Sequence, residues 1–346
     1  MRKEPQTLIS RREILAGLAA SPLLASRVAA QTASAKASIT RFDPAFDQLI
    51  APSATVEILS RGFRWAEGPA WSHQGNFLLF SDPPENIIHR WTRSEGLKTF
   101  LQPSGLQTAV PAGIREPGAN GLAFDAAGRL VVADSGSRAI VRIDPSSGRR
   151  TTLVDRFEGK RFNSPNDLAI GRSGAIYFSD PPYGLADGDA SPLRELDFCG
   201  LYRLAPDGTL ALLDRTHRRP NGVALSRDEK TLYLALSDDN RPEVLAYALD
   251  GEGKPLSQSL FRDMRPQKAA GLPGLPDGIK VGPTGHVFAT GPGGVHICTP
   301  HGKLLGIVGT GKAVSNCSIG EGGAALFMTS SDMLAVISLK PSGRLT

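Results

Sequence analysis

The chain has 346 residues, 40% of them hydrophobic and 21% charged, with 38 glycines, 26 prolines and three cysteines. This composition excludes an intrinsically disordered chain and a disulfide-based scaffold, and the many turn-forming residues argue against a helical bundle. Residues 1–30 hold five of the 39 basic and two of the 34 acidic residues, so the rest of the chain is nearly neutral and nucleic acid is not expected as a partner.

The first thirty residues resemble a bacterial twin-arginine export signal. Arg11-Arg12 precedes a mostly apolar run, residues 14–25, which Pro22 interrupts and which is too short to span a bilayer. The small residues 28–30 then offer a cleavage site. We expect residues 1–30 to be a signal peptide that uses the twin-arginine export machinery and leaves a periplasmic protein without a membrane segment. An uncleaved membrane anchor is the alternative.

The segment before the repeats contains an expected linker and one isolated strand. Residues 31–50 are rich in Ala, Ser and Thr, which predicts a linker without a packed structure of its own. Residues 54–60, ATVEILS, alternate in the manner of a β-strand but belong to no repeat. This strand therefore needs a partner elsewhere in the chain.

The chain beyond residue 60 repeats one pattern six times. Each copy has a short polar signature, an apolar strand, a glycine turn and a second apolar strand that ends near Ser or Asp; residues 123–134, AFDAAGRLVVAD, show the turn and its two strands clearly. Further strands with alternating apolar residues follow, such as residues 139–144. The signatures begin at intervals of 39 to 56 residues, at Glu67, Asn120, Asn166, Asn221, Asp277 and Asn316.

Four strands per repeat at such a period are typical of a β-propeller. Apolar residues recur with period two and turn residues interrupt every strand, which excludes a helical solenoid. We therefore predict an all-β fold for residues 51–346, a six-bladed β-propeller with four-stranded antiparallel blades around a central channel. The last repeat ends after three strands, and residues 54–60 are expected to supply the fourth and close the ring.

The geometry of a propeller brings the six signature residues together. Innermost strands line the channel, so these side chains should point at one axis. All six carry a side-chain oxygen, and Glu67 and Asp277 are acidic. Such a set suits one hard divalent cation, with Ca²⁺ favoured and Mg²⁺, Mn²⁺ and Zn²⁺ left open. The alternative interpretation is that Asn-Gly and Asp-Gly are structural turns that each repeat uses again.

Several motifs accompany these positions: AEGPAW (66–71), FNSPNDLAI (162–170), FSDPPYGL (178–185), RPNGVALS (219–226), GLPDGIKV (274–281) and ATGPGGVHI (289–297). In this order they resemble the gluconolactonase branch of the senescence-marker-protein/gluconolactonase/luciferin-regenerating-enzyme family, from about residue 55 to the C-terminus. The resemblance implies a six-bladed propeller with one divalent cation, usually Ca²⁺, in the central channel.

The resemblance also implies a chemistry for the channel. The family's metal ligands match Glu67, Asn166, Asn221 and Asp277, and Asp277 is also the implied general base. With a cation polarising the carbonyl of a cyclic ester, Asp277 would take a proton from the attacking water. Lactones are reactive enough that no covalent nucleophile is required.

Substrate contacts are less well defined by the motifs. Asn120 and Asn316 are expected to line the substrate pocket, and Arg161 is a weak match to an arginine that contacts substrate in some members. Ser135-Gly136 stands where many gluconolactonases have His-Gly, which leaves the preferred lactone open. The shape of the pocket should depend on three loops, residues 102–118, 183–199 and 238–243.

The expected function is therefore a metal-dependent hydrolase that opens a sugar lactone. Two alternatives remain: a non-catalytic propeller that serves as a binding or scaffold module, and an esterase that acts on other lactones or on aryl esters. The pair of carboxylates on one axis argues against the scaffold, which has no need of them.

Overall fold

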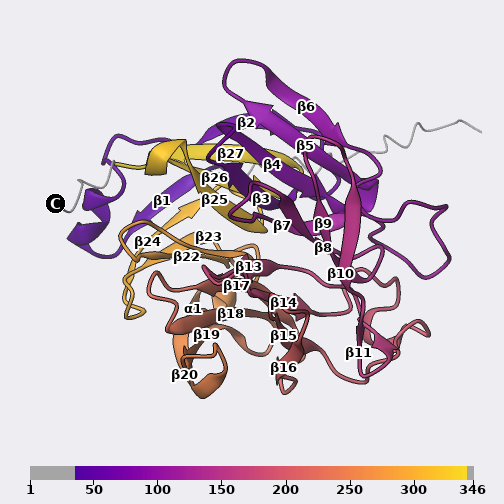
Figure 1. Cartoon of the computed structure of the whole chain (residues 1–346). Helices are drawn as coiled ribbons and strands as arrows, with labels where there is room; N and C mark the ends of the chain where they lie inside the picture. The colour runs from indigo at the N-terminus through magenta and orange to yellow at the C-terminus, as the bar shows by residue number, and fades with distance from the viewer. Residues whose placement is uncertain (1–35, 341–346) are drawn as a thin grey trace, which may run out of the picture. The chain divides into compact units, whose positions relative to one another are not determined.

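The computed structural model describes residues 36–340, so the predicted signal peptide at residues 1–30 lies outside the described part. Within this part, six antiparallel sheets follow one another around a central axis (Figure 1). Five of these sheets take four strands from a single repeat, and the sixth combines three strands of the last repeat with one strand from before the first repeat. One of the five also gains a fifth strand from the N-terminal side. The prediction of a six-bladed β-propeller is confirmed.

Each blade runs from an inner strand at the axis to an outer strand at the rim. In that order, the first three are β3 (Glu67–Ser72), β4 (Phe77–Asp82), β5 (Ile87–Thr92) and β6 (Gly96–Leu101); β7 (Ala119–Phe124), β8 (Leu130–Asp134), β9 (Ala139–Ile143) and β10 (Arg150–Val154); and β13 (Leu168–Ile170), β14 (Ile176–Asp180), β15 (Gly200–Leu204) and β16 (Leu210–Asp214). The next two are β17 (Pro220–Leu225), β18 (Thr231–Ser237), β19 (Pro242–Leu249) and β20 (Pro255–Asp263); and β21 (Ile279–Val281), β22 (Val287–Gly291), β23 (Gly294–Cys298) and β24 (Leu304–Gly309). The sixth begins with β25 (Asn316–Gly320), β26 (Ala325–Ser330) and β27 (Met333–Ser338).

Short elements lie between these strands. Two short strands, β11 (Arg156–Phe157) and β12 (Lys160–Arg161), pair in a small hairpin between the second and third blades. The helical segments of the described part are α1 (Arg265–Ala269) and the 3-10 turns Pro44–Gln48, Pro83–Glu85, Gly188–Ala190 and Glu321–Gly323. Within residues 36–340, none of the helices has the length and apolar character needed to cross a membrane.

A strand from the N-terminal side completes the sixth blade, as predicted. Strand β2 (Glu57–Arg61) pairs antiparallel with β27, with Glu57 opposite Val336 and Arg61 opposite Met333. Figure 1 shows this contact as an indigo strand beside a yellow one. The pairing closes the ring and covers the edge of β27, which would otherwise present unpaired backbone groups.

Residues 38–50 differ from the linker expected there. Strand β1 (Ser38–Arg41) adds a fifth strand to the fifth blade by pairing with β24, and the following turn buries Phe46 and Ile50 completely. A Cβ added at Gly306 of β24 would lie 2.3 Å from the Phe46 ring, so this glycine makes room for the aromatic side chain. The Ala- and Ser-rich composition of the segment does not reveal that these two apolar side chains fix it to the blade.

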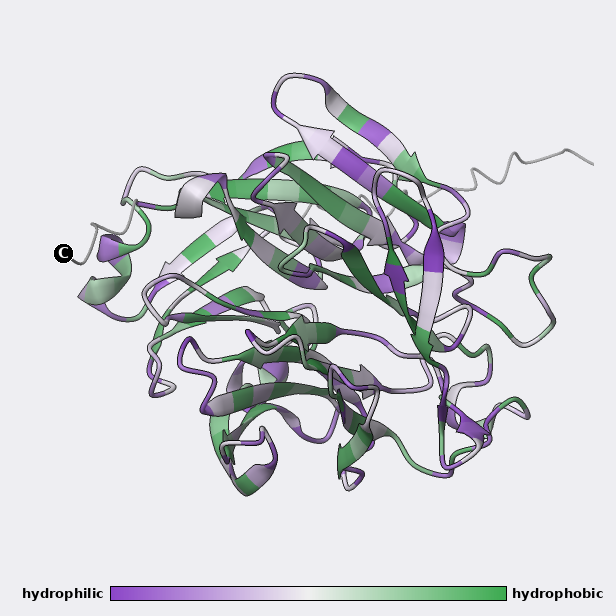
Figure 2. Ribbon diagram, in the orientation of Figure 1, coloured by the Kyte–Doolittle hydropathy of each residue, from purple (hydrophilic) through white to green (hydrophobic). Residues whose placement is uncertain are grey.

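The core consists of six apolar clusters, each between two neighbouring blades. Between the first and sixth blades, for example, Trp71 stacks on Phe327 with 5.3 Å between the ring centroids. Figure 2 shows the apolar residues concentrated in the middle strands of the blades. The middle strands are buried on both faces, which is why Leu78 and Leu79 are both fully buried and why these strands read as continuous apolar runs.

Candidate metal and active site

The polar signatures lie where the inner strands begin. In three inner strands the register with the second strand shifts by one residue at the signature: between residues 67 and 70 of β3, 119 and 122 of β7, and 220 and 223 of β17. A β-bulge of this kind bends the strand and re-aims its side chains. In the third and fifth blades, the signatures at residues 166–167 and 277–278 directly precede β13 and β21 instead.

The glycine after a signature residue allows neighbouring inner strands to approach closely. A Cβ added at Gly222 would lie 2.0 Å from the carbonyl oxygen of Asp277, and one added at Gly68 would lie 2.0 Å from that of Asn120. The backbone φ of Gly222 is not in the left-handed region, so the residue is needed for its small size rather than for a turn. The dipeptides are thus contacts between blades, which differs from the alternative interpretation as repeated turns.

A cavity of about 520 Å³ lies at the axis. Five of the six signature residues line it, each from a different blade: Glu67, Asn120, Asn166, Asn221 and Asp277. The three loops expected to shape the pocket also reach it, through Arg115, Glu116, Tyr183 and Asp239. The repeat pattern therefore identified the floor of the cavity, and the loops between strands form its walls.

Two oxygen atoms on the cavity floor lack a partner among residues 36–340. Asn221 Oδ1 and Asp277 Oδ1 are buried and accept no hydrogen bond there. Asn221 Nδ2 donates to Ser237 Oγ at 2.9 Å, which fixes the amide and leaves its oxygen free. Glu67 Oε2 is held by the backbone N–H of Gly68 at 2.7 Å. Free carboxylate and amide oxygens are the donors that a hard divalent cation takes up, so these residues fit the implied metal.

The donor set also indicates which cation fits. Within the described part of the chain, no three His, Cys, Asp or Glu side chains gather as a metal site, so the amides are needed to complete a coordination sphere. Ca²⁺ accepts amide and carboxylate oxygens together, whereas Zn²⁺ sites are built from His, Cys and carboxylate ligands. The residues present therefore suit Ca²⁺ better than Zn²⁺.

Burial and neighbouring carboxylates raise the pKa of both Glu67 and Asp277 on the cavity floor. Burial raises the pKa of Glu67 to about 7, and the Asp167 carboxylate adds to the effect. The pKa of Asp277 lies well above its ordinary value because of burial first and the Glu67 carboxylate second. A divalent cation in the cavity would favour the charged form of both groups.

A second set of charged groups lies behind the cavity, at positions that the repeat pattern does not predict. Asp167 stands where four of the other repeats have glycine; its Oδ1 accepts from the Leu168 N–H at 2.8 Å. Lys280 Nζ lies 3.9 Å from Asp167 Oδ2 and donates to Asn316 Oδ1 at 3.2 Å. Asn316 Nδ2 in turn lies 3.4 Å from both Glu67 Oε2 and Asp167 Oδ2. The substitution of Asp for Gly in this one repeat was the available signal.

Two of the three expected substrate contacts are placed elsewhere, whereas Asn120 lines the cavity as expected. Asn316 is 2% exposed, packs against Gly278 and uses its amide on the neighbouring carboxylates, so it supports the cavity from behind. Arg161 lies on β12, where its guanidinium donates to the Ser137 carbonyl oxygen at 2.6 Å and does not reach the cavity. The β11–β12 hairpin turns this arginine toward the second blade, which motif spacing does not reveal.

Aspartates at the ends of second strands hold the segments that lead into the signatures. Asp82 accepts hydrogen bonds from the backbone N–H groups of Arg64 at 2.8 Å and Trp65 at 3.1 Å, just before Glu67. Asp180 accepts in the same way from Asn163 and Ser164, both at 2.8 Å, just before Asn166. These carboxylates position the segments that lead into the inner strands, without lining the cavity.

Fold and cavity together define a six-bladed β-propeller with an oxygen-lined small-molecule cavity at its axis. The chain belongs to the SMP-30/gluconolactonase/LRE-like family, whose sequence profile matches residues 65–332. The family resemblance predicted from the motifs is thereby confirmed.

Similar proteins carry lactonase names. A gluconolactonase from Zymomonas mobilis is 43% identical over 351 residues, which cover 97% of this chain and 99% of the relative. A pentonolactonase from Haloferax volcanii is 26% identical over 238 residues, 68% of this chain and 69% of the relative. A solved gluconolactonase from Xanthomonas campestris superposes with a TM-score of 0.75 at 31% identity, covering 87% of this chain and 95% of that one.

Proposed function

We propose that this chain is a hydrolase that opens a sugar lactone and requires one divalent cation, preferentially Ca²⁺. Glu67, Asn166, Asn221 and Asp277 would hold the cation. The observation that supports this most directly is a pair of buried oxygens on the floor of the axial cavity, Asn221 Oδ1 and Asp277 Oδ1, which lack a partner within residues 36–340. The 43% identity to a gluconolactonase over nearly the whole chain supports the choice of substrate.

In this proposal the chain's own residues bind, orient and move a proton. A bound divalent cation supplies Lewis-acid polarisation of the lactone carbonyl. Asp277 would hold the cation with one carboxylate oxygen and accept a proton from the attacking water with the other, a role worth about 10²–10⁴ in rate. Ser237, which is hydrogen-bonded to Asn221, keeps that amide in one orientation, and Asn120 lines the space left for substrate.

A non-catalytic scaffold fits these observations less well. A buried polar group without a partner costs about 1–3 kcal/mol, and the facing carboxyls of Glu67 and Asp277 add repulsion when both are charged. A module that binds through its outer surface gains nothing from this cost. A site that takes up a cation and a polar substrate offsets it.

The test measures hydrolysis of glucono-1,5-lactone above its spontaneous rate, first with Ca²⁺, then with a chelator, then after Ca²⁺ is restored. We expect turnover with Ca²⁺, loss of turnover with the chelator, and recovery when Ca²⁺ is restored. Thermal unfolding provides a readout without substrate, because a cation bound to the native state at 100 times its Kd adds about 2.7 kcal/mol of stability. No cation-dependent turnover on a panel of sugar lactones would favour the scaffold.

We also propose that residues 1–30 direct the chain through twin-arginine export to the periplasm. The paired Arg11-Arg12 before a short apolar run supports this proposal. Replacing both arginines with lysine should leave the full-length precursor in the cytoplasmic fraction of a bacterial host. Unchanged appearance of a shortened product in the periplasm would refute it.

A further inference from the structure

Two loops join above the axial cavity to form one wall. One connects the first and second blades, and the other follows β14. The backbone N–H groups of Arg115 and Glu116 donate to the carbonyl oxygen of Gly184 at 2.8 and 3.2 Å. The Arg115 guanidinium donates to the carbonyl oxygen of Tyr183. These contacts fix the backbones of Glu116 and Tyr183 beside each other at the cavity.

Small residues beneath this wall set its position. Gly184 donates its N–H to Ser164 Oγ at 2.9 Å, and an added Cβ would lie 2.8 Å from Ser164 Cβ and 3.2 Å from Ser135 Cβ. Ser135 is buried and donates to the Pro165 carbonyl oxygen at 2.8 Å. The small side chain at position 135 therefore leaves the space in which the Tyr183-Gly184 turn sits.

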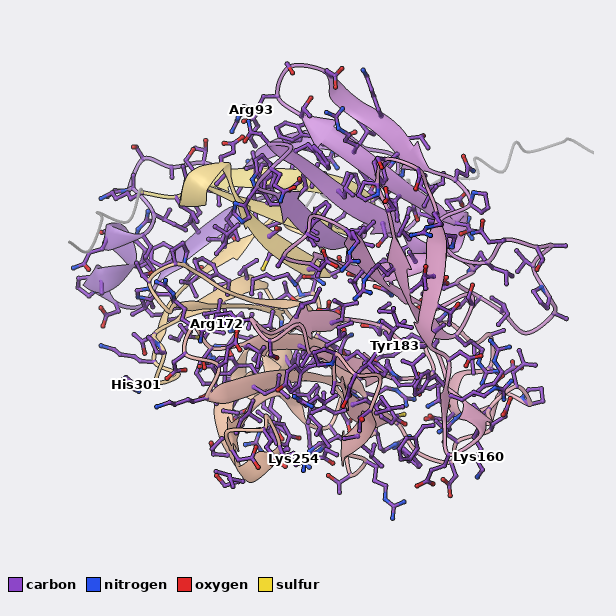
Figure 3. The ribbon with its side chains drawn as sticks, in the orientation of Figure 1. Arg93, Lys160, Arg172, Tyr183, Lys254 and His301 are labelled. Atoms are coloured by element: carbon purple, nitrogen blue, oxygen red, sulfur yellow. The ribbon has the colours of Figure 1, made fainter. Side chains whose placement is uncertain are left out.

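The wall presents two polar atoms that have no partner in the described part of the chain, Glu116 Oε2 and the Tyr183 hydroxyl. The other carboxylate oxygen of Glu116 is held by Arg115 at 3.1 Å, and the Glu116 side chain is 13% exposed. The Tyr183 hydroxyl lies near Ser237 and Asp277. Figure 3 labels Tyr183 beside the third blade, close to β14. Both residues line the cavity that holds the proposed metal site.

We propose that Glu116 and Tyr183 bind hydroxyl groups on the ring of the sugar lactone and so determine the preference for a hydroxylated substrate. This inference rests on the proposed lactonase function and adds two residues that recognise the substrate. Glu116 Oε2 would accept a hydrogen bond from one ring hydroxyl, and the Tyr183 hydroxyl would donate to another. Neither bond forms with a lactone that has no hydroxyl groups.

The character of these two atoms separates them from the proposed metal ligands. The free atoms of Asn221 and Asp277 are oxygen acceptors at the inner strands, as a cation requires. Tyr183 offers a phenol, which needs an acceptor for its proton and is not an ordinary ligand of a hard cation. Glu116 sits on the same wall as Tyr183, with one oxygen already used by Arg115.

Such a site discriminates against substrate analogues that leave its buried polar groups without hydrogen-bond partners. When a substrate analogue lacks the hydroxyls, the buried carboxylate and phenol stay without partners, and binding of that analogue is disfavoured. We therefore expect the wild-type protein to prefer glucono-1,5-lactone over δ-valerolactone, which has the same ring size and no hydroxyl groups.

The experiment compares kcat/KM of Glu116→Gln and Tyr183→Phe on these two lactones in the presence of Ca²⁺. Each substitution should lower kcat/KM on glucono-1,5-lactone about 10- to 100-fold, mainly through KM, and leave δ-valerolactone within about twofold. Glu243→Gln and Tyr202→Phe are matched controls, since both residues are buried and lie outside the cavity. Both controls should retain wild-type kinetics on both lactones.

Two further measurements keep the result independent of turnover. The affinity for the non-hydrolysable glucono-1,5-lactam, measured by calorimetry, should fall in both variants by a factor similar to the fall in kcat/KM. Calorimetric affinity for Ca²⁺ alone should stay within about threefold of wild type. A large loss of Ca²⁺ affinity in Glu116→Gln would make Glu116 a metal ligand and overturn its assignment to substrate.

The outcomes separate this inference from the proposed function. If the wild type hydrolyses both lactones and the variants lose equal activity on each, the wall is structural and the inference is wrong. If the variants keep their preference for glucono-1,5-lactone, the hydroxyls are recognised elsewhere and the inference is also wrong. If the wild type hydrolyses neither lactone in any cation, the proposed function fails; unchanged lactam binding in the variants would then refute the wall's role as well.

Discussion

Asp277 combines a buried oxygen that has no partner among residues 36–340 with a raised pKa. Asp277→Asn keeps the shape of the side chain and removes its charge and its basicity. We expect lactone turnover to fall about 10²–10⁴-fold. The metal-free variant should unfold at a higher temperature than the metal-free wild type, because repulsion with Glu67 is gone. Rates with Ca²⁺ and thermal unfolding with chelator measure the two effects.

A surface aspartate provides the control for this substitution. Asp263 is paired with Arg265 at 2.8 Å, away from the cavity, so Asp263→Asn should change neither turnover nor metal response. Full activity in Asp277→Asn would remove this residue from the mechanism. Lost activity together with an unfolded protein would instead assign it a structural role.

Glu67 should make the stability of the metal-free protein depend on pH. Burial raises its pKa from 4.5 to about 7, so between these values the folded state holds a proton that the unfolded state has released. This stabilisation is complete below about pH 4.5 and is lost as the pH rises through about 7, on the order of 3 kcal/mol. Denaturant unfolding with chelator should show a fall to which other buried carboxyls of raised pKa, such as Asp180 and Asp277, also contribute, and Glu67→Gln should reduce it by the Glu67 share. A metal-free protein that gains stability through Glu67 across this window would contradict the assignment.

The sequence predicted those cavity residues that occupy a fixed position in each repeat. It did not predict the cavity residues that lie on loops outside the repeat pattern. Glu67, Asn120, Asn166, Asn221 and Asp277 occupy equivalent repeat positions, so one structural argument located them all at the cavity. The roles of Glu116 and Tyr183 could not be predicted. They lie on irregular loops whose mutual hydrogen bonds join segments about seventy residues apart.

The inner strands depend on glycine at the points where the blades meet. A Cβ at Gly222 would lie 2.0 Å from the Asp277 carbonyl oxygen, which is backbone and cannot move aside easily. Gly222→Ala should destabilise the protein by about 1–3 kcal/mol and weaken Ca²⁺ binding, since it pushes two proposed ligand strands apart. Gly251→Ala is the control, because an added Cβ there meets no atom within 4 Å. Equal stability of the two variants by denaturant unfolding would show that the blades adjust freely.

The alternation of apolar and polar residues predicts where strands lie but not where their pairing is irregular. The strands appeared where apolar residues alternate or run together, and β2 pairs with β27 as predicted. The one-residue bulges in β3, β7 and β17 were not predictable, because a bulge changes pairing and leaves the composition of a strand unchanged. These bulges coincide with three of the signatures, including those of the proposed ligands Glu67 and Asn221.

For the described part of the molecule, internal repetition was the strongest predictor of fold. Six copies of one strand pattern left a closed ring as the simplest way to cover the edges of the blades. Composition was a weaker guide, since residues 38–50 looked like a linker but pack on the fifth blade. A short segment needs one or two large apolar anchors to be fixed, and average composition does not reveal them.

Phe46 tests whether this N-terminal segment belongs to the folded ring. Its ring is fully buried against β24, in the space that Gly306 leaves open, so Phe46→Ala should lower the free energy of unfolding by about 3–5 kcal/mol. Phe42→Ala is the matched control, because that side chain is 54% exposed and should change stability by less than about 0.5 kcal/mol. The cavity is lined by other segments, so Ca²⁺-dependent turnover of Phe46→Ala at low temperature should match the wild type. A stability loss as small as that of Phe42→Ala in denaturant unfolding would mean that the segment is a linker after all.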